Sequence, residues 1–323
     1  MVETTHGVPG DEWDAALRRA GGHFLQSSGW QQVQETLGSP VVCSIEPGEW
    51  MWAVHLGERW TRYLYVPCGP TLMRAASAPG CFNDLRRNAE ADRATFVRLE
   101  PTGACDVLEL RDSGAREVRP RQPRDTWLLD LTVDEAALRR GLTKGHRTGI
   151  NAAERKGLRI RRSTDPDDVA VLVAMLAGTA RRTPFHPFSQ RYYRTVANLL
   201  MPRDLACLYI AEADGRPVAA AMGFDFNRVR YYAHAGSDPD ARRLSPQTPL
   251  VWRMILDAKS QGAVTFDFWG VLPVVRPGHP WAGFTQFKQA FGGRLETRAG
   301  TWELPVRRQR YRLHRTMRLL ARR

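Results

Sequence analysis

The sequence predicts an α+β protein built from two tandem domains of the same design. The first observation is a repeated order of elements, because strand, turn, strand, strand, helix and strand follow one another in both halves of the chain. The second is a tight turn between the first two strands of each copy, Glu46-Pro47-Gly48-Glu49 and then Asp214-Gly215. The third is size: 323 residues, 43% of them hydrophobic, suffice for one large or two medium domains. Together these features favour a duplicated α+β fold.

In the first half, alternating apolar residues predict strands at 41–45, 50–56, 63–67 and 96–99, with a polar helix at 83–93. An earlier helix is expected from Asp11 to Ala20, where Gly21-Gly22 ends it.

The second half repeats this order, with strands expected at 205–213, 218–226, 230–235 and 264–268. The helix before the last strand is predicted at 249–260, with Thr248 as its N-cap and Pro249 at its first position. A capping-box pattern at 132–135 predicts a helix that ends at Arg140. Further helices are expected at 144–156, 165–181 and 189–200, the last capped by Ser189.

The polar segment 122–127, which contains Pro123, marks the expected domain boundary and leads into a strand at 127–131. We therefore expect a first domain over 1–125 and a second over 126–299, with residues 300–323 left as a C-terminal segment. Residues 307–323 within that segment predict a basic amphipathic helix with Leu313, Met317 and Leu320 on one face and eight arginines around them.

The formal net charge of +13 favours partners rich in phosphate or carboxylate, although many basic proteins bind no polyanion. Lysine is rare, since Lys144, Lys156, Lys259 and Lys288 are the four lysines among 47 basic residues. A lysine retained in an arginine-rich chain hints at a place where a planar guanidinium would not serve.

The five cysteines show no CxxC spacing, so neither a disulfide framework nor a metal site is expected. The sequence also has no apolar run of about 18 residues and no signal-peptide pattern at its start. We expect a cytoplasmic protein without a membrane-spanning helix.

Six segments stand out, in order along nearly the whole chain: HFLQSSGW at 23–30, YVPCGP at 65–70, RTGINAAERKG at 147–157, TAR at 179–181, DFWG at 267–270 and GFTQFKQAFGG at 283–293. Together they resemble the FemABX family of aminoacyl-tRNA-dependent peptidyltransferases. Each one alone is weak evidence, whereas the ordered set ending in the FKxxFGG-type segment is specific.

This resemblance implies two domains of the acetyltransferase (GNAT) fold, with residues 300–323 returning to pack on the first. It also implies transfer of an amino acid from aminoacyl-tRNA, as a co-substrate without a cofactor, to an amine of a peptidoglycan precursor. Three positions depart from the family pattern: Met73 replaces an acidic residue, and Phe185 and His234 stand where tyrosines contact substrate. The chain lacks room for a long helical-hairpin insertion, which favours a compact member acting on a soluble precursor.

Lys288 is the catalytic candidate. Such a reaction needs positive charge where the oxyanion develops, and the family motif places an ammonium there. Phe287 and Phe291 lie four residues apart and pack inward, so Lys288 occupies another helical face. The motif also puts Phe287 among the substrate-binding candidates. The alternative for Lys288 is an ordinary solvated lysine.

The family resemblance implies that Arg181 and Thr179 bind an acceptor phosphate, by a guanidinium fork and a hydroxyl. The alternative for Arg181 is an interaction with a helix C-terminus. Tyr232 and His234, two residues apart, are expected on one face of a strand. The family resemblance implies that this face lines the substrate channel. A lone strand histidine is more often structural, so a general-base role for His234 is the weaker interpretation.

Trp30 and Tyr65 are further substrate-binding candidates in the first domain, with plain core packing as the alternative. Lys144, Arg147 and Asn151 share a helix face and could contact RNA, but a solvated charged face is the commoner explanation.

Three other functions remain open. An acetyl-coenzyme A-dependent acetyltransferase would share the fold, but residues 242–249 contain no glycine for a pyrophosphate loop. A non-enzymatic RNA- or membrane-binding protein would leave the FKxxFGG-type segment unexplained. A third possibility keeps the chemistry and changes the acceptor to an antibiotic scaffold. The basic tail could bind tRNA, contact the inner membrane surface or close the first domain, and its apolar stripe favours the last.

Overall fold

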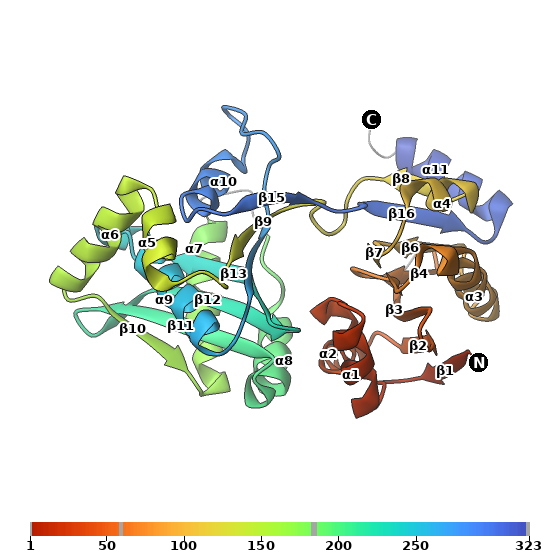
Figure 1. Cartoon of the computed structure of the whole chain (residues 1–323), viewed down its shortest axis with the longest axis horizontal. Helices are drawn as coiled ribbons and strands as arrows, with labels where there is room; N and C mark the ends of the chain where they lie inside the picture. The colour runs from red at the N-terminus through yellow and green to blue at the C-terminus, as the bar shows by residue number, and fades with distance from the viewer. Residues whose placement is uncertain (1, 58–60, 182–185, 321–323) are drawn as a thin grey trace. The chain divides into compact units, whose positions relative to one another are not determined.

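The computed structural model describes residues 2–57, 61–181 and 186–320, and it divides the chain into two compact units (Figure 1). The first unit contains residues 1–124 together with 297–323, and the second contains residues 125–296. Each unit has its own mixed sheet covered by helices. The predicted fold class, two tandem α+β domains, is therefore confirmed.

The sheet of the first unit has the order β1-β2-β3-β4-β6-β16-β8. Its strands are β1 (Glu3–His6), β2 (Val41–Glu46), β3 (Trp50–Gly57), β4 (Tyr63–Val66), β6 (Phe96–Leu99), β8 (Arg116–Val118) and β16 (Thr301–Pro305). The short strands β5 (Thr71–Leu72) and β7 (Thr102–Gly103) extend it beside β3. The neighbours β4 and β6 run parallel. A helix, α3 (Ala78–Ala91), connects them along the chain, as a parallel pair requires.

Opposite faces of this sheet are covered by different helices, because side chains alternate along each strand. Leu64 and Val66 of β4 join the apolar core that contains Phe82 and Leu85 of α3. The alternate residues Tyr63 and Tyr65 lie with Phe96 and with Tyr311 of the C-terminal helix α11 (Arg308–Leu320). The described residues of this unit also form the helices α1 (Asp11–Arg19), α2 (Ser28–Thr36) and α4 (Val107–Asp112).

The sheet of the second unit has the order β10-β11-β12-β13-β14-β9-β15. Its strands are β9 (Asp125–Asp130), β10 (Arg159–Ser163), β11 (Ala206–Ala213), β12 (Arg216–Phe226), β13 (Val229–Ser237), β14 (Thr265–Gly270) and β15 (Arg294–Thr297). Again one pair, β13 and β14, is parallel and is connected by a helix, α9 (Gln247–Ser260). The two units thus share the arrangement of an antiparallel run that ends in a parallel pair.

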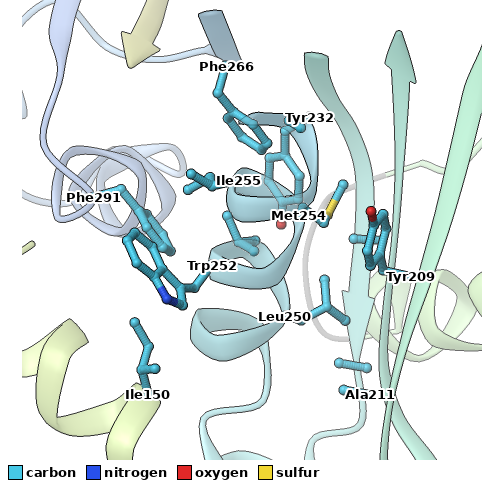
Figure 2. Close-up of a cluster of buried hydrophobic side chains, with 14 of the residues drawn as sticks. Ile150, Tyr209, Ala211, Tyr232, Leu250, Trp252, Met254, Ile255, Phe266 and Phe291 are labelled. Atoms are coloured by element: carbon cyan, nitrogen blue, oxygen red, sulfur yellow. The ribbon is translucent and has the colours of Figure 1, made fainter. Parts of the chain in front are cut away.

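The core of the second unit lies between this sheet and the helices α6 (Lys144–Arg155) and α9. In Figure 2 the side chains of Leu250 and Met254 project from α9 toward Tyr209 and Ala211 of β11. The part of this unit that the structure describes also contains α5 (Glu135–Gly141), α7 (Val169–Ala180), α8 (Gln190–Leu200) and α10 (Ala282–Gln289). Helix α7 contacts β12 and β13, and Gly236 of β13 allows this approach, because a Cβ there would lie 2.6 Å from the Met175 carbonyl carbon.

Two predicted helix caps are wrong. Helix α9 begins at Gln247 after Pro246, whose ring fixes φ near the value a helix start needs, so Thr248 lies inside the helix. Helix α5 is capped by Asp134, whose carboxylate accepts a 2.6 Å hydrogen bond from the Ala137 N–H. The Thr132 hydroxyl donates to Asp130 and is not available as a cap. The capping-box pattern at 132–135 therefore predicted the N-cap two residues too early. Ser189 does cap α8, as predicted.

Candidate active site

The candidate site is built around the place where the parallel pairing of β13 and β14 ends. Their ladder runs from Val229 opposite Thr265 to Tyr231 opposite Asp267. Beyond that point β14 continues beside β9, with Gly270 opposite Thr126, while β13 remains paired with β12. The residues that follow Asp267 on β14 are therefore held by β9 and by neighbouring helices.

A sharp turn in the DFWG segment follows at once. Asp267 is 1% exposed, and its carboxylate accepts hydrogen bonds from the Thr126 hydroxyl and, at 2.7 Å, from the Trp269 N–H. Trp269 has a φ of 64°, in the left-handed region of the backbone that residues other than glycine rarely adopt. Its ring meets Tyr231 edge-on at 5.9 Å. The hydrogen bonds of the buried Asp267 thus hold the backbone turn that positions Gly270.

Lys288 is buried at this turn. Its side chain comes from α10, is 8% exposed, and donates a 2.7 Å hydrogen bond from Nζ to the Gly270 carbonyl oxygen. The ammonium also lies 5.0 Å from the centre of the Phe284 ring, within the range of a cation–π contact. The interpretation of Lys288 as an ordinary solvated lysine is therefore wrong.

Burial also changes the charge equilibrium of Lys288. Desolvation disfavours the ammonium and lowers its pKa to about 8, although the nearby Asp267 carboxylate opposes the shift. A lysine with a pKa in this range holds its charge at neutral pH and releases its proton easily above it. Such perturbation is typical of functional lysines, although structural ones show it too.

Helix α10 is attached to the end of β14 by two of its buried residues. Thr285, one turn before Lys288, accepts a 3.1 Å hydrogen bond from the Leu272 N–H, while Lys288 binds Gly270. A spacing of three places both side chains on the same helical face. The sequence did not identify Thr285, Thr126 or Asp267 as parts of the site. The DFWG segment was the available signal for Asp267.

The two glycines that end the FKxxFGG-type segment are required by close backbone packing. Gly293 has φ of 98°, and a Cβ on it would lie 2.2 Å from the Leu128 carbonyl oxygen. The neighbouring Gly292 accepts a 2.6 Å hydrogen bond from the Trp127 indole N–H. These contacts fix the chain after α10 against β9, and so fix the position of Lys288.

His146 of α6 is a second titratable group near α10 that the sequence did not reveal. Its Nε2 lies 3.2 Å from the Phe287 carbonyl oxygen, and its ring centre is 4.5 Å from that of Phe291. Burial lowers its pKa. Phe287 itself packs against the apolar core, as expected for a residue four before Phe291. The contact of Phe287 with substrate stays a prediction.

Tyr232 and His234 lie on opposite faces of the sheet, so the prediction that they share one face is wrong. A β-bulge at Ala233 is the reason: Tyr232 pairs with Gly223 and His234 with Met222, so one extra residue separates them. Tyr232 packs on Phe266 and Phe268 in the core between the sheet and α9.

His234 lies in an aromatic cluster on the opposite face. Rings of Phe188, Tyr192, Tyr193 and Phe224 have their centres 5.2 to 6.2 Å from its own. Burial lowers the pKa of His234 to about 4. The imidazole is therefore neutral at physiological pH.

The predicted phosphate-binding residues lie at the C-terminus of α7. Arg181 is exposed and occupies the C-cap, where its N–H donates to the Ala177 carbonyl. The Thr179 hydroxyl donates a 3.1 Å hydrogen bond to the Met175 carbonyl, one turn earlier. Phe185, one of the departures from the family pattern, lies outside the described residues. The roles of Arg181 and Thr179 stay predictions.

Tyr65 and Trp30 are buried in the first unit, at 3% and 8% exposure. The Tyr65 hydroxyl donates a 2.9 Å hydrogen bond to Glu100, and burial together with that carboxylate raises the pKa of Tyr65 well above its usual value. Glu100 also accepts from the Cys68 and Gln122 N–H groups and from the Thr301 hydroxyl. These contacts are what a structural residue requires, and substrate binding by Tyr65 or Trp30 stays a prediction.

The first two family-like segments are joined by the buried side chain of Gln26. Its amide donates to the Ala53 and Pro67 carbonyls and accepts from the Ala53 N–H, at 2.8 to 3.0 Å. Ser27 caps α2 through the Trp30 N–H. The FLQSSGW and YVPCGP segments therefore have a structural explanation within the first unit.

Within the described residues, no group of three or more histidine, cysteine, aspartate or glutamate side chains is placed to hold a metal ion. Among the same residues, none of the helices has the length and apolar character needed to cross a membrane.

Comparison with known proteins agrees with the fold. Residues 139–288, which lie in the second unit, match the family described as "Acetyltransferase (GNAT) domain". No curated protein matches the sequence significantly.

Three solved structures are similar over nearly the whole chain. FemX has a TM-score of 0.85 at 15% identity, covering 96% of this chain and 99% of its own. The L-PGS of Bacillus licheniformis has a TM-score of 0.62 at 16% identity, covering 99% of both chains. A tandem GNAT protein from the clavulanic acid biosynthesis pathway has a TM-score of 0.56 at 15% identity, covering 95% of this chain and 99% of its own. The architecture is therefore a FemX-like pair of GNAT-fold domains.

Proposed function

We propose that this chain, which has the FemX fold over nearly its whole length, is an aminoacyltransferase that uses aminoacyl-tRNA as donor. The acceptor is an amine on the peptide of a peptidoglycan precursor, and the product is a peptide bond made without a ribosome. Such a donor places the reaction in the cytoplasm. The observation that carries the proposal is the buried ammonium of Lys288 at the point where β13 and β14 stop pairing.

The reaction requires mainly that the protein hold the amine beside the ester carbonyl and supply positive charge for the oxyanion. The acceptor amine attacks the ester carbonyl, a C–N bond forms, and the tetrahedral intermediate carries an oxyanion. Its collapse breaks the C–O bond, and the ribose oxygen leaves with a proton that the amine releases. An ammonium in a dry site stabilises the oxyanion strongly, because low dielectric increases the attraction. The bond to Gly270 uses one of the three N–H donors of Lys288.

The start of α9 supports this donor over acetyl-coenzyme A. A pyrophosphate is commonly bound by free N–H groups at a helix N-terminus. Here Pro246 and Pro249 have no N–H to offer, and the Thr248 N–H donates to the Ser245 carbonyl at 3.2 Å. The helix that would receive coenzyme A therefore has few donors for it.

The proposal is tested by incubating the purified chain with a mixture of charged tRNAs and with nucleotide-linked or lipid-linked peptidoglycan precursors. Mass spectrometry of the acceptor should show one added amino acid, and ribonuclease treatment should abolish the product. A parallel reaction with acetyl-coenzyme A is the control. An added acetyl group that survives ribonuclease would overturn the proposal and identify an acetyltransferase. An aminoacylated antibiotic-type amine with untouched peptidoglycan precursors would replace the acceptor and keep the donor.

A further inference from the structure

The C-terminal helix α11 is attached to the first unit by its polar and aromatic face. Tyr311 is 3% exposed, packs on Phe96 and donates a 2.9 Å hydrogen bond to Glu303. His314 packs on Phe96 as well, and Arg318 donates to Glu303 at 3.1 Å. These three residues are spaced by three and four, so they form one side of the helix.

The apolar stripe of α11 faces solvent, so the prediction that this stripe closes the first domain is wrong. Leu313, Met317 and Leu320 are 61%, 52% and 64% exposed. At 100° per residue they lie opposite Tyr311 and Arg318 around the helix axis. The helix therefore docks by hydrogen bonds and ring contacts, and leaves its large apolar side chains on the outside.

Positive charge surrounds this stripe. At the same angular step, Arg310 lies on one side of the stripe and Arg312 on the other. Residues 306–323 contain eight arginines and no acidic residue. Exposed leucines between arginines on one helix are the pattern of a helix that lies in the interface of an anionic membrane.

A groove of about 390 Å³ lies on the other side of the helix, because Arg315, Arg318 and Leu319 fall nearer to Tyr311 than to the stripe around the helix axis. Arg119, Arg315 and Arg318 line it together with Leu319, which is 61% exposed. Its two acidic residues are already paired, Glu117 with Arg124 and Glu303 with Arg98. The groove is therefore separate from the surface that carries the stripe, and the membrane contact is argued from the stripe and its flanking arginines.

We propose that the outer face of α11 binds the surface of a bilayer that contains anionic lipids. Leu313, Met317 and Leu320 enter the interfacial region, and the arginines contact lipid phosphates. RNA would use the arginines but would leave the stripe in water, so the exposed apolar side chains favour the membrane. The inference rests on α11 alone and does not depend on the donor or acceptor proposed above.

The test is sedimentation of the full chain with vesicles of phosphatidylcholine, with and without phosphatidylglycerol. The parent should bind the anionic vesicles and lose binding as salt rises. Changing Leu313, Met317 and Leu320 together to serine should weaken binding by at least about tenfold, because the interfacial burial is lost. Arg310→Gln with Arg312→Gln should weaken it about fivefold for each arginine.

Leu108→Ser is the matched control, since Leu108 is also 61% exposed but lies in α4 of the same unit. It should bind vesicles like the parent. All variants should melt near the parent, because Tyr311, His314 and Arg318 are unchanged.

Three results would overturn the inference. The first is a parent that fails to bind anionic vesicles, and the second is a triple serine variant that binds them like the parent. The third is a protein that binds tRNA through these arginines and does not bind vesicles. The last would assign the helix to RNA. Aminoacyl transfer to a water-soluble acceptor should be the same in the parent and the triple serine variant, and a failure of that assay in both would affect the proposed function alone.

Discussion

The ammonium of Lys288 is hydrogen-bonded to the carbonyl of Gly270, 18 residues earlier in the chain. This bond joins α10 to the end of β14 at the candidate site. Lys288 therefore has a structural partner as well as a proposed catalytic role, and experiments must separate the two. Lys259 offers a comparison, because its ammonium also donates to a backbone carbonyl, that of Leu131, at 2.8 Å.

The first prediction concerns Lys288→Met, which keeps a long side chain and removes the charge. Turnover should fall by about 10²–10³-fold, as for loss of one oxyanion donor. The KM for the acceptor should change little, because the contact forms in the transition state. Lys259→Met is the control and should keep its turnover. The catalytic role is excluded if both variants lose activity equally, or if Lys288→Met retains it with an unchanged melting temperature.

The second prediction is the pH dependence of turnover. The pKa of Lys288 lies at about 8, so the ammonium is present below that pH and is lost above it. If the charged form is the active one, kcat should fall with a midpoint near pH 8 on the alkaline side. In Lys288→Arg the remaining rate should lack this decrease, because a guanidinium stays charged. A kcat that rises through the same midpoint would assign the neutral amine as a base instead.

The third prediction uses His234. Its pKa is about 4 in the folded protein and about 6.5 when unfolded, so the unfolded state binds more protons between these values. Stability should therefore fall as the pH is lowered through this window, by at most about 3 kcal/mol. His234→Phe should not show this part of the loss. Urea unfolding of both proteins from about pH 7 to about pH 4 measures the difference. Parallel curves would show that His234 does not titrate as a buried group.

The fourth prediction concerns the two glycines at the ends of the family-like segment. Gly293→Ala should destabilise the protein by at least about 2 kcal/mol, since its φ is 98° and the new Cβ would overlap Leu128. Gly283→Ala is the control at an exposed position of α10, where a Cβ meets nothing within 4 Å. It should raise stability by up to about 1 kcal/mol. Thermal unfolding of the two variants decides, and similar melting temperatures would contradict the packing argument.

The fifth prediction tests Arg181. If its guanidinium binds an acceptor phosphate, Arg181→Lys should raise the KM for a phosphorylated acceptor while kcat changes little, because a point charge cannot replace the bidentate fork. Folding should be unaffected, since Arg181 is exposed at the C-cap of α7. An acceptor without its phosphate serves as the comparison and should show the same KM in both proteins. An unchanged KM for the phosphorylated acceptor would remove Arg181 from the site.

The duplicated fold was predictable where local patterns are strong. The alternation at 41–45 and 50–56 and the turn between them predicted β2 and β3 almost to the residue. Strand β16 was missed, because five residues carry little periodicity and its place between β6 and β8 depends on contacts some 200 residues apart. Strand β1 was missed as well, since all four of its side chains are exposed.

The candidate site was predictable only in part. The family-like segment selected Lys288, yet its burial and its bond to Gly270 depend on how α10 meets β14, which no local pattern records. The bulge at Ala233 shows a second limit, because one extra residue reversed the relation between Tyr232 and His234. The apolar stripe of α11 was identified correctly but assigned to the wrong side, since amphipathicity does not tell which face of a helix is covered.

The insertion of β16 between β6 and β8 sets the order in which the chain can fold during synthesis. Trp302 and Leu304 belong to the core of the first unit, but the ribosome makes them after residues 125–296. Until β16 is synthesised, the sheet of the first unit lacks the strand between β6 and β8, and the edges of these two strands are unpaired. The second unit is contiguous in sequence and can fold before the first is complete. Proteins commonly mature from the N-terminus onward. Here the N-terminal unit is completed last, and a ribosome that stalls before residue 301 leaves it unfinished.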